Sequence, residues 1–357
     1  MTPLTSGKTR PVRLADIAKA AGVSHGTASN VFARPDIVRE EVRERVKAAA
    51  EAMGYAGPDP KGRLLRAGKV NAIGVATGEP LSYFFDDPFA RVMMASISQA
   101  CDATGAGISL VSAANSEQLA WNIQSALVDG FIVFCMEGDS RLVQLARERK
   151  LPFVALDLDS DDQAVAAIGV DNIEGAGLAA RHLAELGHRR FAVLTLPCVD
   201  GRFGAVTQAQ VEKALFSATR DRLRGYFGEL VRFGIDVSNV PICETVNDEK
   251  SVWAGLDHIF AGSRPTAILA MSDKIALHAL DWLRQHDIAV PGDVSIVGFD
   301  GVPEGADSKP PLTTVAQPIA EMGRRAVKAI LENDGSLSRQ LLPVDLVVRS
   351  SSGPSPA

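Results

Sequence analysis

Residues Gly22 to Gly26 read "GVSHG", which fits the G-x-S-x-G pattern of a hydrolase nucleophile. That chemistry needs a strand before the serine, so that its hydroxyl stands on a strained turn between the strand and a helix. Apolar residues before Gly22 instead recur with the spacing of one helix face, at Leu14, Ile17, Ala18 and Ala21. No Asp and His partners at suitable positions complete a triad with Ser24. We therefore reject Ser24 as a nucleophile.

Ser24 fits the start of a second helix better. Gly22 follows the last apolar position of the first helix, where a residue in the left-handed conformation commonly ends a helix. The Ser24 hydroxyl can then accept a hydrogen bond from a backbone N–H near Thr27. Ala28 and Val31 continue the buried face. Two short helices joined by a tight turn predict a helix-turn-helix, whose second helix enters DNA.

A third helix completes the predicted head. The stretch "VREEVRERVKAAAEAMGY" has a helical apolar stripe, and Gly54 ends it. We expect the stripe to be buried at Val38, Val42, Val46, Ala49 or Ala50, and Met53. Residues 57–69 then form a hinge or linker, because glycine and proline interrupt regular structure there, while "KGRLLRAG" could form a short basic helix.

Charge is distributed unevenly along the chain. Residues 1–70 hold 13 Lys and Arg against 7 Asp and Glu, a net charge of +6, whereas the whole chain has −6. The rest of the chain therefore carries −12. A basic head on an acidic body suits DNA binding by the head alone. Charge by itself favours the alternative of a solvated helix, and the helix-turn-helix pattern decides for DNA.

From Asn71 onward, apolar runs of strand length alternate with helical stretches. Runs that are apolar on both faces predict parallel sheets covered by helices on both sides. The pattern occurs twice, starting at "KVNAIGVA" and at "HRRFAVLTL". Two doubly wound halves would leave a ligand cleft at the carboxyl ends of their strands. The stretch from "PPLTTVAQ" to "LLPVDLVVRSS" is expected to return across the hinge between the halves.

Several protein classes are excluded by what the sequence lacks. Four widely spaced cysteines without C-x-x-C predict neither a disulfide framework nor a zinc site. The N-terminus has no apolar signal region, and no apolar stretch is long enough to span a bilayer. We find no phosphate-binding glycine loop, metal cluster or triad. The sequence therefore predicts a cytoplasmic protein that is not an enzyme and uses no cofactor, metal or membrane.

The chain resembles the lactose-repressor (LacI/GalR) family of bacterial transcription regulators from about Val12 to Ser350. The motifs that carry this resemblance are "RLADIAKAAGVSHGTASNVF", "VREEVRERVKAAAEAMGY", "VDNIEGAGLAARHLAELGHRRFAVL", "RPTAILAMSDKIALHAL", "VPGDVSIVGFD" and "PPLTTVAQPIAEMGRRAV". The resemblance implies an α/β protein with a three-helix DNA-binding head and a two-lobed, doubly wound core of the periplasmic-binding-protein type. The expected domains are the head at 1–56, the hinge at 57–69, the core at 70–350 and a flexible tail at 351–357.

The resemblance also implies a homodimer on a near-palindromic operator, with residues 24–32 in the major groove. The implied DNA-contacting residues of this helix are Ser24, His25, Gly26, Thr27, Ser29 and Asn30. Asn30 can pair with adenine, whereas Thr27 and Ser29 suit phosphate. Gly26 has no side chain, so either its backbone approaches the DNA or the neighbouring base is not read.

The hinge is implied to contact the minor groove. "GRLLR" resembles the family's hinge-helix pattern and assigns Arg63 and Leu65 to this contact, with Leu65 wedged between bases. The alternative is a linker leucine packed on the core. The C-terminal "RSSSGPSPA" has no apolar heptads, so we expect a dimer rather than a tetramer.

The resemblance implies a small-molecule effector, a sugar or related metabolite, held between the lobes. The implied contact residues are Gly78, Asp157, Arg222, Ser272 and Asp300. The aromatic residues Tyr83, Phe84 and Phe85 could supply an apolar wall, and Phe84 is our candidate contact among them. An arginine and carboxylates give strong directional hydrogen bonds to sugar hydroxyls. A structural ion pair remains the alternative for Arg222 and Asp300, as core packing does for the aromatic residues.

One segment departs from the family pattern. "PCVDGRFGAVTQAQVEKALFSATRD" is longer than usual, and residues 206–219 are expected to form an extra helical turn or a flap over the cleft. The preferred function is a repressor whose operator affinity is controlled by its effector. A plain sugar-binding protein is the alternative of another class, which the basic head and the missing signal oppose.

Overall fold

The computed structural model describes residues 12–57, 69–112, 116–134, 141–156, 165–199, 201–262, 264–332 and 339–356. The chain forms two compact units, residues 1–70 and 71–357. The boundary between the units coincides with the end of the predicted hinge. Most of the hinge, including Arg63 and Leu65, lies outside the described residues.

The first unit contains the predicted helix-turn-helix. Its helices are α1 (Leu14–Ala20), α2 (His25–Ala33), the short 3-10 helix η1 (Pro35–Ile37) and α3 (Glu40–Ala52). Gly22 has a φ of 62°, which confirms that the turn after α1 uses the left-handed conformation. The small core of this unit buries Leu14, Ile17, Ala18, Ala21, Ala28, Val31, Val46 and Ala50.

Two details of the third helix differ from the prediction. Val38 lies before α3 in extended backbone and is only partly buried. Met53, expected in the buried stripe, follows the last helical residue and is exposed. The chain turns there through Gly54, whose φ is 65°. Tyr55, rather than Met53, packs against the core of the first unit. Its ring meets Phe32 edge-on, with ring centroids 5.8 Å apart.

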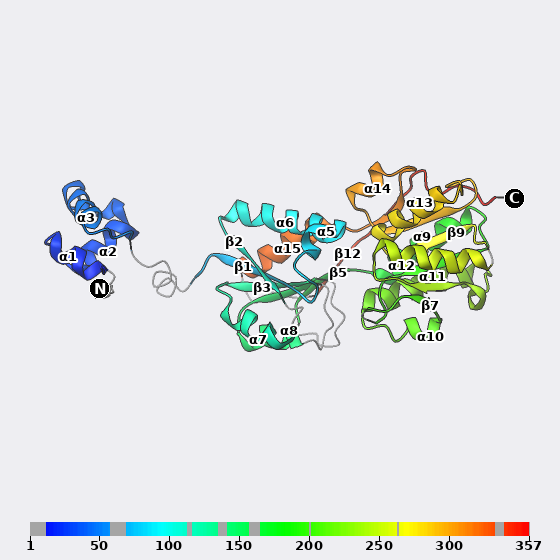
Figure 1. Ribbon diagram of the computed structural model, residues 1–357, viewed down its shortest axis with the longest axis horizontal. Coiled ribbons are helices and arrows are strands. Elements are labelled where there is room, and N and C mark those ends of the chain that lie inside the picture. Colours follow the sequence, from blue (N-terminus) through cyan, green and yellow to red (C-terminus); the bar gives the residue numbers. More distant parts are fainter. Residues whose placement is uncertain are drawn as a thin grey trace, which may run out of the picture. The chain divides into compact units, whose positions relative to one another are not determined.

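The second unit is the predicted pair of α/β lobes (Figure 1). The sheet of lobe 1 has the order β12-β5-β4-β3-β1-β2, and all its pairings are parallel. Its strands are β1 (Ala72–Thr77), β2 (Gly107–Ser112), β3 (Gly130–Phe134), β4 (Phe153–Leu156), β5 (Ala167–Val170) and β12 (Gln340–Leu342). Its helices are α5 (Tyr83–Asp86), α6 (Pro88–Thr104), α7 (Ser116–Ser125), α8 (Arg141–Glu148) and α15 (Ile319–Glu332).

The sheet of lobe 2 has the order β13-β11-β10-β9-β6-β8-β7, with antiparallel strands only at its two edges. Its strands are β6 (Phe191–Thr195), β7 (Gly204–Val206), β8 (Ile242–Glu244), β9 (Ala267–Ala270), β10 (Ser295–Asp300), β11 (Thr313–Ala316) and β13 (Asp345–Val347). Its helical segments are α9 (Asn172–Glu185), α10 (Gln208–Val211), α11 (Ser217–Arg232), η2 (Val237–Asn239), α12 (Glu249–Ala261), α13 (Asp273–Gln285) and α14 (Pro303–Asp307).

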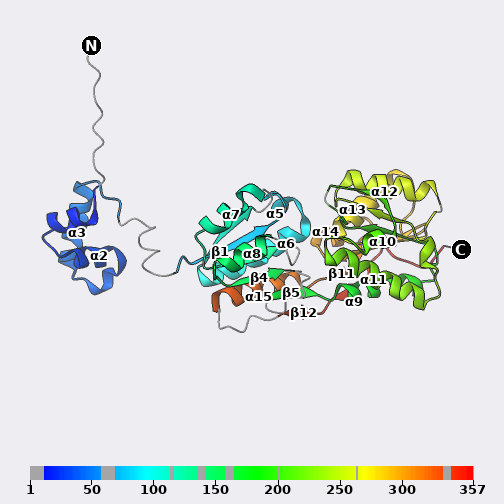
Figure 2. The same cartoon turned by 90° about the horizontal axis from the view of Figure 1, so that it is seen from below.

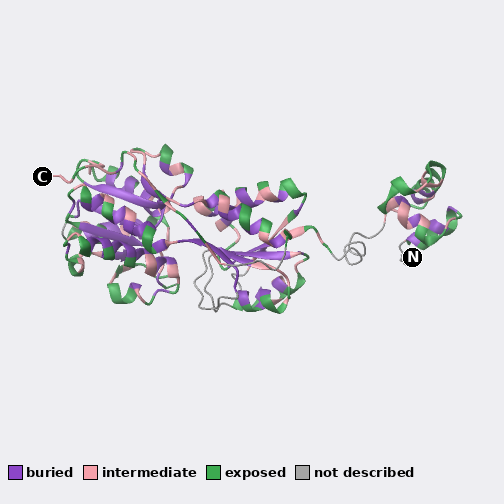
Figure 3. Ribbon diagram, turned by 180° about the vertical axis from the view of Figure 1, so that it is seen from behind, coloured by how far each residue is buried: buried purple, intermediate pink, exposed green. Residues whose placement is uncertain are grey.

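Helices cover both faces of each sheet, so the strands are buried on both sides (Figure 3). Neighbouring strand residues therefore belong to different cores. Val193 packs toward α9 and α11, whereas Leu194 packs toward α12 and α13. In lobe 1, α6 and α15 lie on one face and α7 and α8 on the other. Because both faces of these strands are buried, their sequences are continuous apolar runs.

The chain crosses between the lobes three times. It leaves lobe 1 after β5 and enters lobe 2 at α9. It returns after β11 to form α15 and β12, where β12 runs parallel to β5 (Figure 2), and it crosses again to β13. The predicted return of the C-terminal stretch is confirmed. The same stretch also contains β11 and β13, which the sequence analysis did not assign.

The predicted flexible tail is wrong for residues 351–356. Ser351 is fully buried, and its hydroxyl donates to the Ile296 carbonyl at 2.7 Å and accepts from the Thr313 N–H at 2.8 Å. Ser355 N–H donates to the Leu186 carbonyl at 2.9 Å. We call residues 349–355 the C-terminal strap, because backbone and hydroxyl hydrogen bonds fix this segment to lobe 2 although it carries few apolar side chains.

The long segment before Arg222 contains the predicted extra helical turn and also an edge strand that was not predicted. Residues 204–206 form the edge strand β7, and 208–211 form the short helix α10. The fully buried Glu244 holds the start of this segment. Its carboxylate accepts from the backbone N–H groups of Cys198 and Val199 at 2.6 and 2.8 Å, and from Arg202 Nε at 2.8 Å. Residues 215–219 then line the cleft described below.

Candidate functional site

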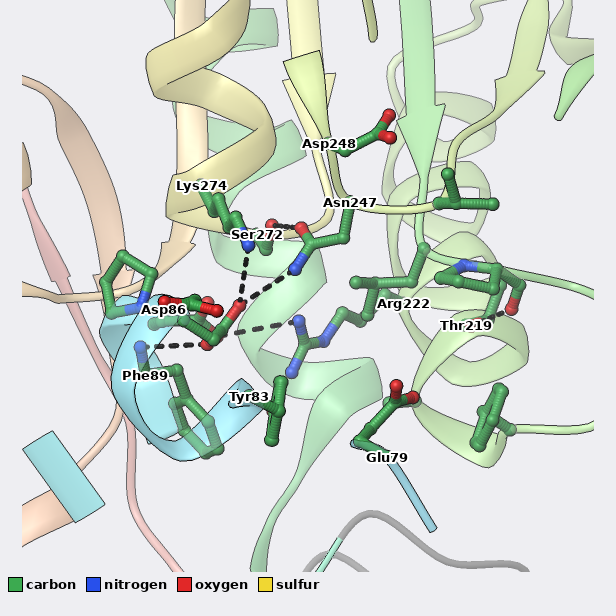
Figure 4. Close-up of a pocket in the computed structure, with 18 of the residues that line it drawn as sticks. Glu79, Tyr83, Asp86, Phe89, Thr219, Arg222, Asn247, Asp248, Ser272 and Lys274 are labelled. Carbon is green, nitrogen blue, oxygen red and sulfur yellow. Dashed lines mark hydrogen bonds and ion pairs between the residues drawn. The ribbon is translucent and has the colours of Figure 1, made fainter. Parts of the chain in front are cut away.

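A cavity of about 400 Å³ lies between the lobes at the carboxyl ends of their strands. Residues that follow β1, β6, β8, β9, β10 and β11 all line it. Apolar and polar groups alternate around its wall (Figure 4). The polar and charged lining residues include Glu79, Asp86, Asp87, Thr219, Arg220, Arg222, Asn247, Asp248, Ser272, Lys274, Asp300 and Gln317. A cavity of this size and composition suits a small polar ligand.

Arg222, on α11, is held rigidly in this cavity. Its Nε donates to Asn172 Oδ1 at 2.8 Å, and its Nη1 donates to the Met271 carbonyl. The guanidinium carbon lies 3.7 Å from the centre of the Phe299 ring, and Nη1 lies 3.7 Å from Asp300 Oδ1. Fixed donors of this kind can orient a ligand at little further entropic cost.

Asp300 ends β10 opposite this arginine. Its backbone φ is 129°, and its Oδ1 accepts from Gln317 Nε2 at 2.8 Å. Burial raises the pKa of the Asp300 carboxyl well above its ordinary value, and the Arg222 guanidinium opposes that rise. The positive φ is one that residues other than glycine rarely adopt, and such strain gathers at functional sites.

The loop after Asp300 is fixed by a second buried carboxylate. Asp273 Oδ2 accepts from the N–H groups of Gly301 and Val302, each at 2.8 Å, and its Oδ1 accepts from the Thr314 hydroxyl at 2.5 Å. Burial raises the pKa of Asp273, and these hydrogen bonds oppose the rise. Asp273 therefore supports the site by positioning the loop.

Polar side chains join the two lobes across the cavity. Asp87 caps α6 through Oδ1, which accepts from the Phe89 and Ala90 N–H groups, and its Oδ2 accepts from Asn247 Nδ2 of lobe 2 at 3.0 Å. Asn247 Oδ1 accepts from the Ser272 hydroxyl at 2.7 Å, and Lys274 Nζ lies 3.5 Å from Asp87 Oδ2 (Figure 4).

A second inter-lobe contact lies outside the cavity lining. Arg91, one turn further along α6, pairs with Glu304 of α14. Both contacts use the first turns of α6, so that end of α6 is hydrogen-bonded and ion-paired to lobe 2.

The predicted effector residues fall into three groups. Arg222, Ser272 and Asp300 line the cavity and lie close together, so the ion pair proposed as the alternative for Arg222 and Asp300 is present within the binding cavity itself. Phe84 is buried in the lobe 1 core and does not line the cavity, whereas its neighbour Tyr83 does. Gly78 is exposed beside the lining residue Glu79, and Asp157 lies outside the described residues.

Sequence analysis missed three residues of the site that share one signal: two line the cavity, and the third, Asn172, holds Arg222. Asn172, Asn247 and Gln317 each follow a strand end by a few residues, where a ligand cleft is expected. Applying that rule to every strand would have found Asn172 and Asn247. Gln317 was missed because the strand before it, β11, was not assigned.

In the head, α2 presents the predicted DNA-contacting residues. Ser24 Oγ accepts from Thr27 N–H at 3.0 Å and lies 2.8 Å from Thr27 Oγ1, which confirms the predicted cap. His25 and Gly26 are exposed, and Thr27, Ser29 and Asn30 are partly exposed. The Ser24 hydroxyl thus binds within the helix itself, whereas the side chains of His25 and Asn30 are exposed or partly exposed, as base contact would require.

Two further observations concern metal binding and membrane spanning. Within the described part of the chain, no group of three or more His, Cys, Asp or Glu residues is placed to hold a metal ion. No helix among the described residues combines the length and apolarity needed to cross a membrane.

A helix-turn-helix unit followed by a two-lobed core with a ligand-sized cleft defines a class of DNA-binding regulators with a binding-protein-like core. Residues 13–57 match the family model "Bacterial regulatory proteins, lacI family", and residues 180–352 match "Periplasmic binding protein-like domain". The chain is 36% identical over 353 residues to the HTH-type transcriptional regulator Rv3575c of Mycobacterium tuberculosis, covering 97% of this chain and 98% of that protein. The protein belongs to the lacI family, and it is a transcriptional regulator.

Solved structures agree with this assignment. The dimer of the lac repressor bound to operator and the anti-inducer ONPF is 26% identical, with a TM-score of 0.76, over 96% of this chain and 100% of that chain. The complex of the transcriptional regulator CelR with cellobiose is 27% identical, with a TM-score of 0.69, over the same shares of the two chains.

Proposed function

We propose that this regulator is a repressor whose operator affinity is controlled by a small polyhydroxylated effector, a sugar or a related metabolite, bound in the inter-lobe cavity. The observation that carries the proposal is the cavity of about 400 Å³ with Arg222 and Asp300 in its wall, in the same chain as a helix-turn-helix. Similarity to a cellobiose-bound regulator supports a sugar, and similarity to an operator-bound repressor dimer supports repression by a homodimer.

In this proposal, His25, Ser29 and Asn30 contact the operator from the major groove, with Gly26 close to the DNA backbone. Thr27 and Ser24 position the helix. Arg63 and Leu65 contact the minor groove from the hinge. The regulator binds a two-fold symmetric operator as a homodimer. Arg222, Ser272 and Asp300 contact the effector, and Tyr83 takes the aromatic role first assigned to Phe84.

Fluorescence anisotropy with operator DNA tests the DNA-binding part. The operator is first selected from random duplexes by the full-length protein. Affinity should fall steeply with salt, because Lys and Arg displace counterions from phosphate. A fragment that begins at Lys69 should not bind. Full affinity in that fragment, or an affinity independent of salt, contradicts the proposal.

Asp300→Ala tests the effector part. This variant should bind operator as the unchanged protein does but should no longer respond to any sugar that releases the unchanged protein from DNA. Asp102→Ala, an exposed carboxylate at the far end of α6, is the matched control and should respond normally. A normal response in Asp300→Ala overturns the assignment of the cavity.

A further inference from the structure

Each cation that lines the cavity is already engaged by the protein. Lys274 Nζ lies 3.5 Å from the buried carboxylate of Asp87. Arg220 Nη1 donates to the carbonyls of Ala214 and Leu215. Arg222 is held by Asn172, by the Met271 carbonyl and by Asp300, as described above. A ligand anion would have to share these charged groups with the acceptors that already contact them.

Carboxylates outnumber these cations in the cavity wall. Among the residues that the structure describes in the wall, three cations face five acidic residues, which are Glu79, Asp86, Asp87, Asp248 and Asp300. If Asp300 is counted as protonated because burial raises its pKa, four carboxylates still face three cations. Asp86 and Asp248 are exposed at the edge of the cavity. The described wall therefore carries a net negative formal charge, and a cleft with apolar walls strengthens the effect of such charges on a ligand.

The rim carboxylate of Asp248 is ionised at neutral pH. Although desolvation opposes the shift, hydrogen bonds from Ser251 hold the pKa of Asp248 below its ordinary value. The same carboxylate caps α12 by accepting from Ser251 N–H at 2.9 Å. Its charge is thus fixed in place at the mouth of the cavity.

In contrast to the carboxylates, the first turn of α11 in the cavity wall could favour binding of an anion. Residues Ser217, Ala218 and Thr219 of its first turn line the cavity, and no side chain caps this helix. The N–H groups of a first helical turn can bind an anion, but they also bind a hydroxyl or carbonyl oxygen. Figure 4 shows the carboxylate of Glu79 on the same side of the cavity as Thr219. A negative charge of the protein itself therefore already lies on that side.

We infer that the cavity selects uncharged polyhydroxylated ligands and rejects their phosphate esters, with Asp86 and Asp248 as the residues that exclude the ester. This inference rests on the proposed function and narrows its ligand class. A hydroxyl group both donates and accepts, so it can pair with the carboxylates and with the fixed donors of the wall. A phosphate monoester carries a charge of about −1.5 to −2 and, when fully ionised, only accepts. It would lie beside the carboxylates of Asp86 and Asp248, and the described cations of the wall already contact acceptors of the protein.

Calorimetric titration with matched pairs tests the inference. The probes are pentoses, hexoses and disaccharides, each with its monophosphate ester, titrated into the full-length protein. For every sugar that binds, the ester should bind at least about tenfold more weakly, as expected when like charges are brought together. High salt should narrow the difference, because it screens the exposed rim charges.

A double variant tests whether Asp86 and Asp248, at the edge of the cavity, cause the difference in affinity between sugar and ester. Asp86→Asn with Asp248→Asn removes two charges, and asparagine still caps α12. In this variant the difference between sugar and ester should shrink by at least about threefold, as expected when repulsive elements that exclude the ester are removed. Asp102→Asn with Glu185→Asn removes two exposed charges elsewhere and should leave the difference unchanged.

The outcomes separate this inference from the proposed function. An ester that binds as tightly as its sugar overturns the inference but leaves an effector-controlled repressor in place. An unchanged difference in the rim variant overturns the role of Asp86 and Asp248. If neither member of any pair binds, the inference is wrong, and operator binding measured alone then decides whether the protein is still a DNA-binding repressor.

Discussion

At the scale of single residues, Ser24 shows how a short motif can suggest the wrong chemistry. Its neighbours match a nucleophile pattern, yet its hydroxyl accepts from Thr27 N–H and starts α2. The difference lies in what precedes the serine, because α1 is a helix with a buried face and not a strand. Ser24 therefore orders the helix that reads DNA.

Ser24→Ala should destabilise the start of α2 by about 1 kcal/mol, because the first-turn N–H groups lose their acceptor. Hydrogen exchange on the full-length protein should show the Thr27 amide exchanging about five times faster, as 1 kcal/mol implies. Ser24→Thr retains a capping hydroxyl and should exchange like the unchanged protein. Equal exchange in both variants would show that the cap contributes nothing to the order of α2.

At the scale of elements, the C-terminal strap is the clearest addition that the structure makes. Two histidines contact it. His188 is fully buried, its Nε2 lies 3.0 Å from the Gly353 carbonyl oxygen, and its Nδ1 lies 3.0 Å from Thr266 Oγ1. His182 Nε2 lies 2.8 Å from Ser352 Oγ. Lobe 2 is therefore completed by residues that follow its last strand.

Stability depends on pH through His188, which is buried and in contact with the strap. Burial lowers the pKa of His188 below its ordinary 6.5, the Gly353 carbonyl opposes this, and His182 and Arg189 add to it. The unfolded chain therefore takes up a proton more readily than the folded protein. The stabilisation is complete above pH 6.5 and is lost as pH falls through the lowered pKa.

Thermal unfolding between pH 5 and pH 8 should accordingly show less loss of stability toward acid in His188→Gln than in the unchanged protein. His258→Gln, which alters an exposed histidine of α12, is the control and should leave the pH dependence unchanged. If His188→Gln and the unchanged protein lose the same stability between these pH values, the strap is not the acid-sensitive part of lobe 2.

At the scale of the whole core, the response to an effector depends on how the lobes meet. Asp87, Asn247 and Ser272 join them inside the cavity, and Arg91 and Glu304 join them outside its lining. A ligand can shift the lobe arrangement only by binding one arrangement more tightly than another. Contacts between the lobes therefore influence effector affinity even where they do not touch the effector.

Arg91→Gln tests this coupling, because neither Arg91 nor Glu304 lines the cavity. A partly exposed ion pair contributes about 0.2–1 kcal/mol, so effector affinity should fall by up to about fivefold as the lobe arrangement that contains this pair becomes less populated. Calorimetry with a sugar that binds the unchanged protein measures the loss. Exchanging the charges, in Arg91→Glu with Glu304→Arg, should restore the affinity. Failure of the exchanged pair to restore it would show that this contact is not coupled to the site.

The sequence by itself determined the architecture. Helical spacing of Leu14, Ile17, Ala18 and Ala21 fixed α1, and runs such as residues 267–270 and 295–300 fixed central strands. These predictions succeeded because a strand buried on both faces, or a helix buried on one, must carry its apolar residues at a local period. Local periodicity also explains why the head and the two lobes could be recognised without any knowledge of contacts between them.

Only the tertiary structure decided which side chains face one another across the cleft. Phe84 and Tyr83 are adjacent in sequence, yet Phe84 belongs to the core and Tyr83 lines the cavity. The contact of Asp87 with Asn247 joins residues 160 positions apart, and the strap's Gly353 meets His188 across 165 positions. Such pairs carry no periodic signal, because they are created by the crossing of the chain between lobes and not by the conformation of any one segment.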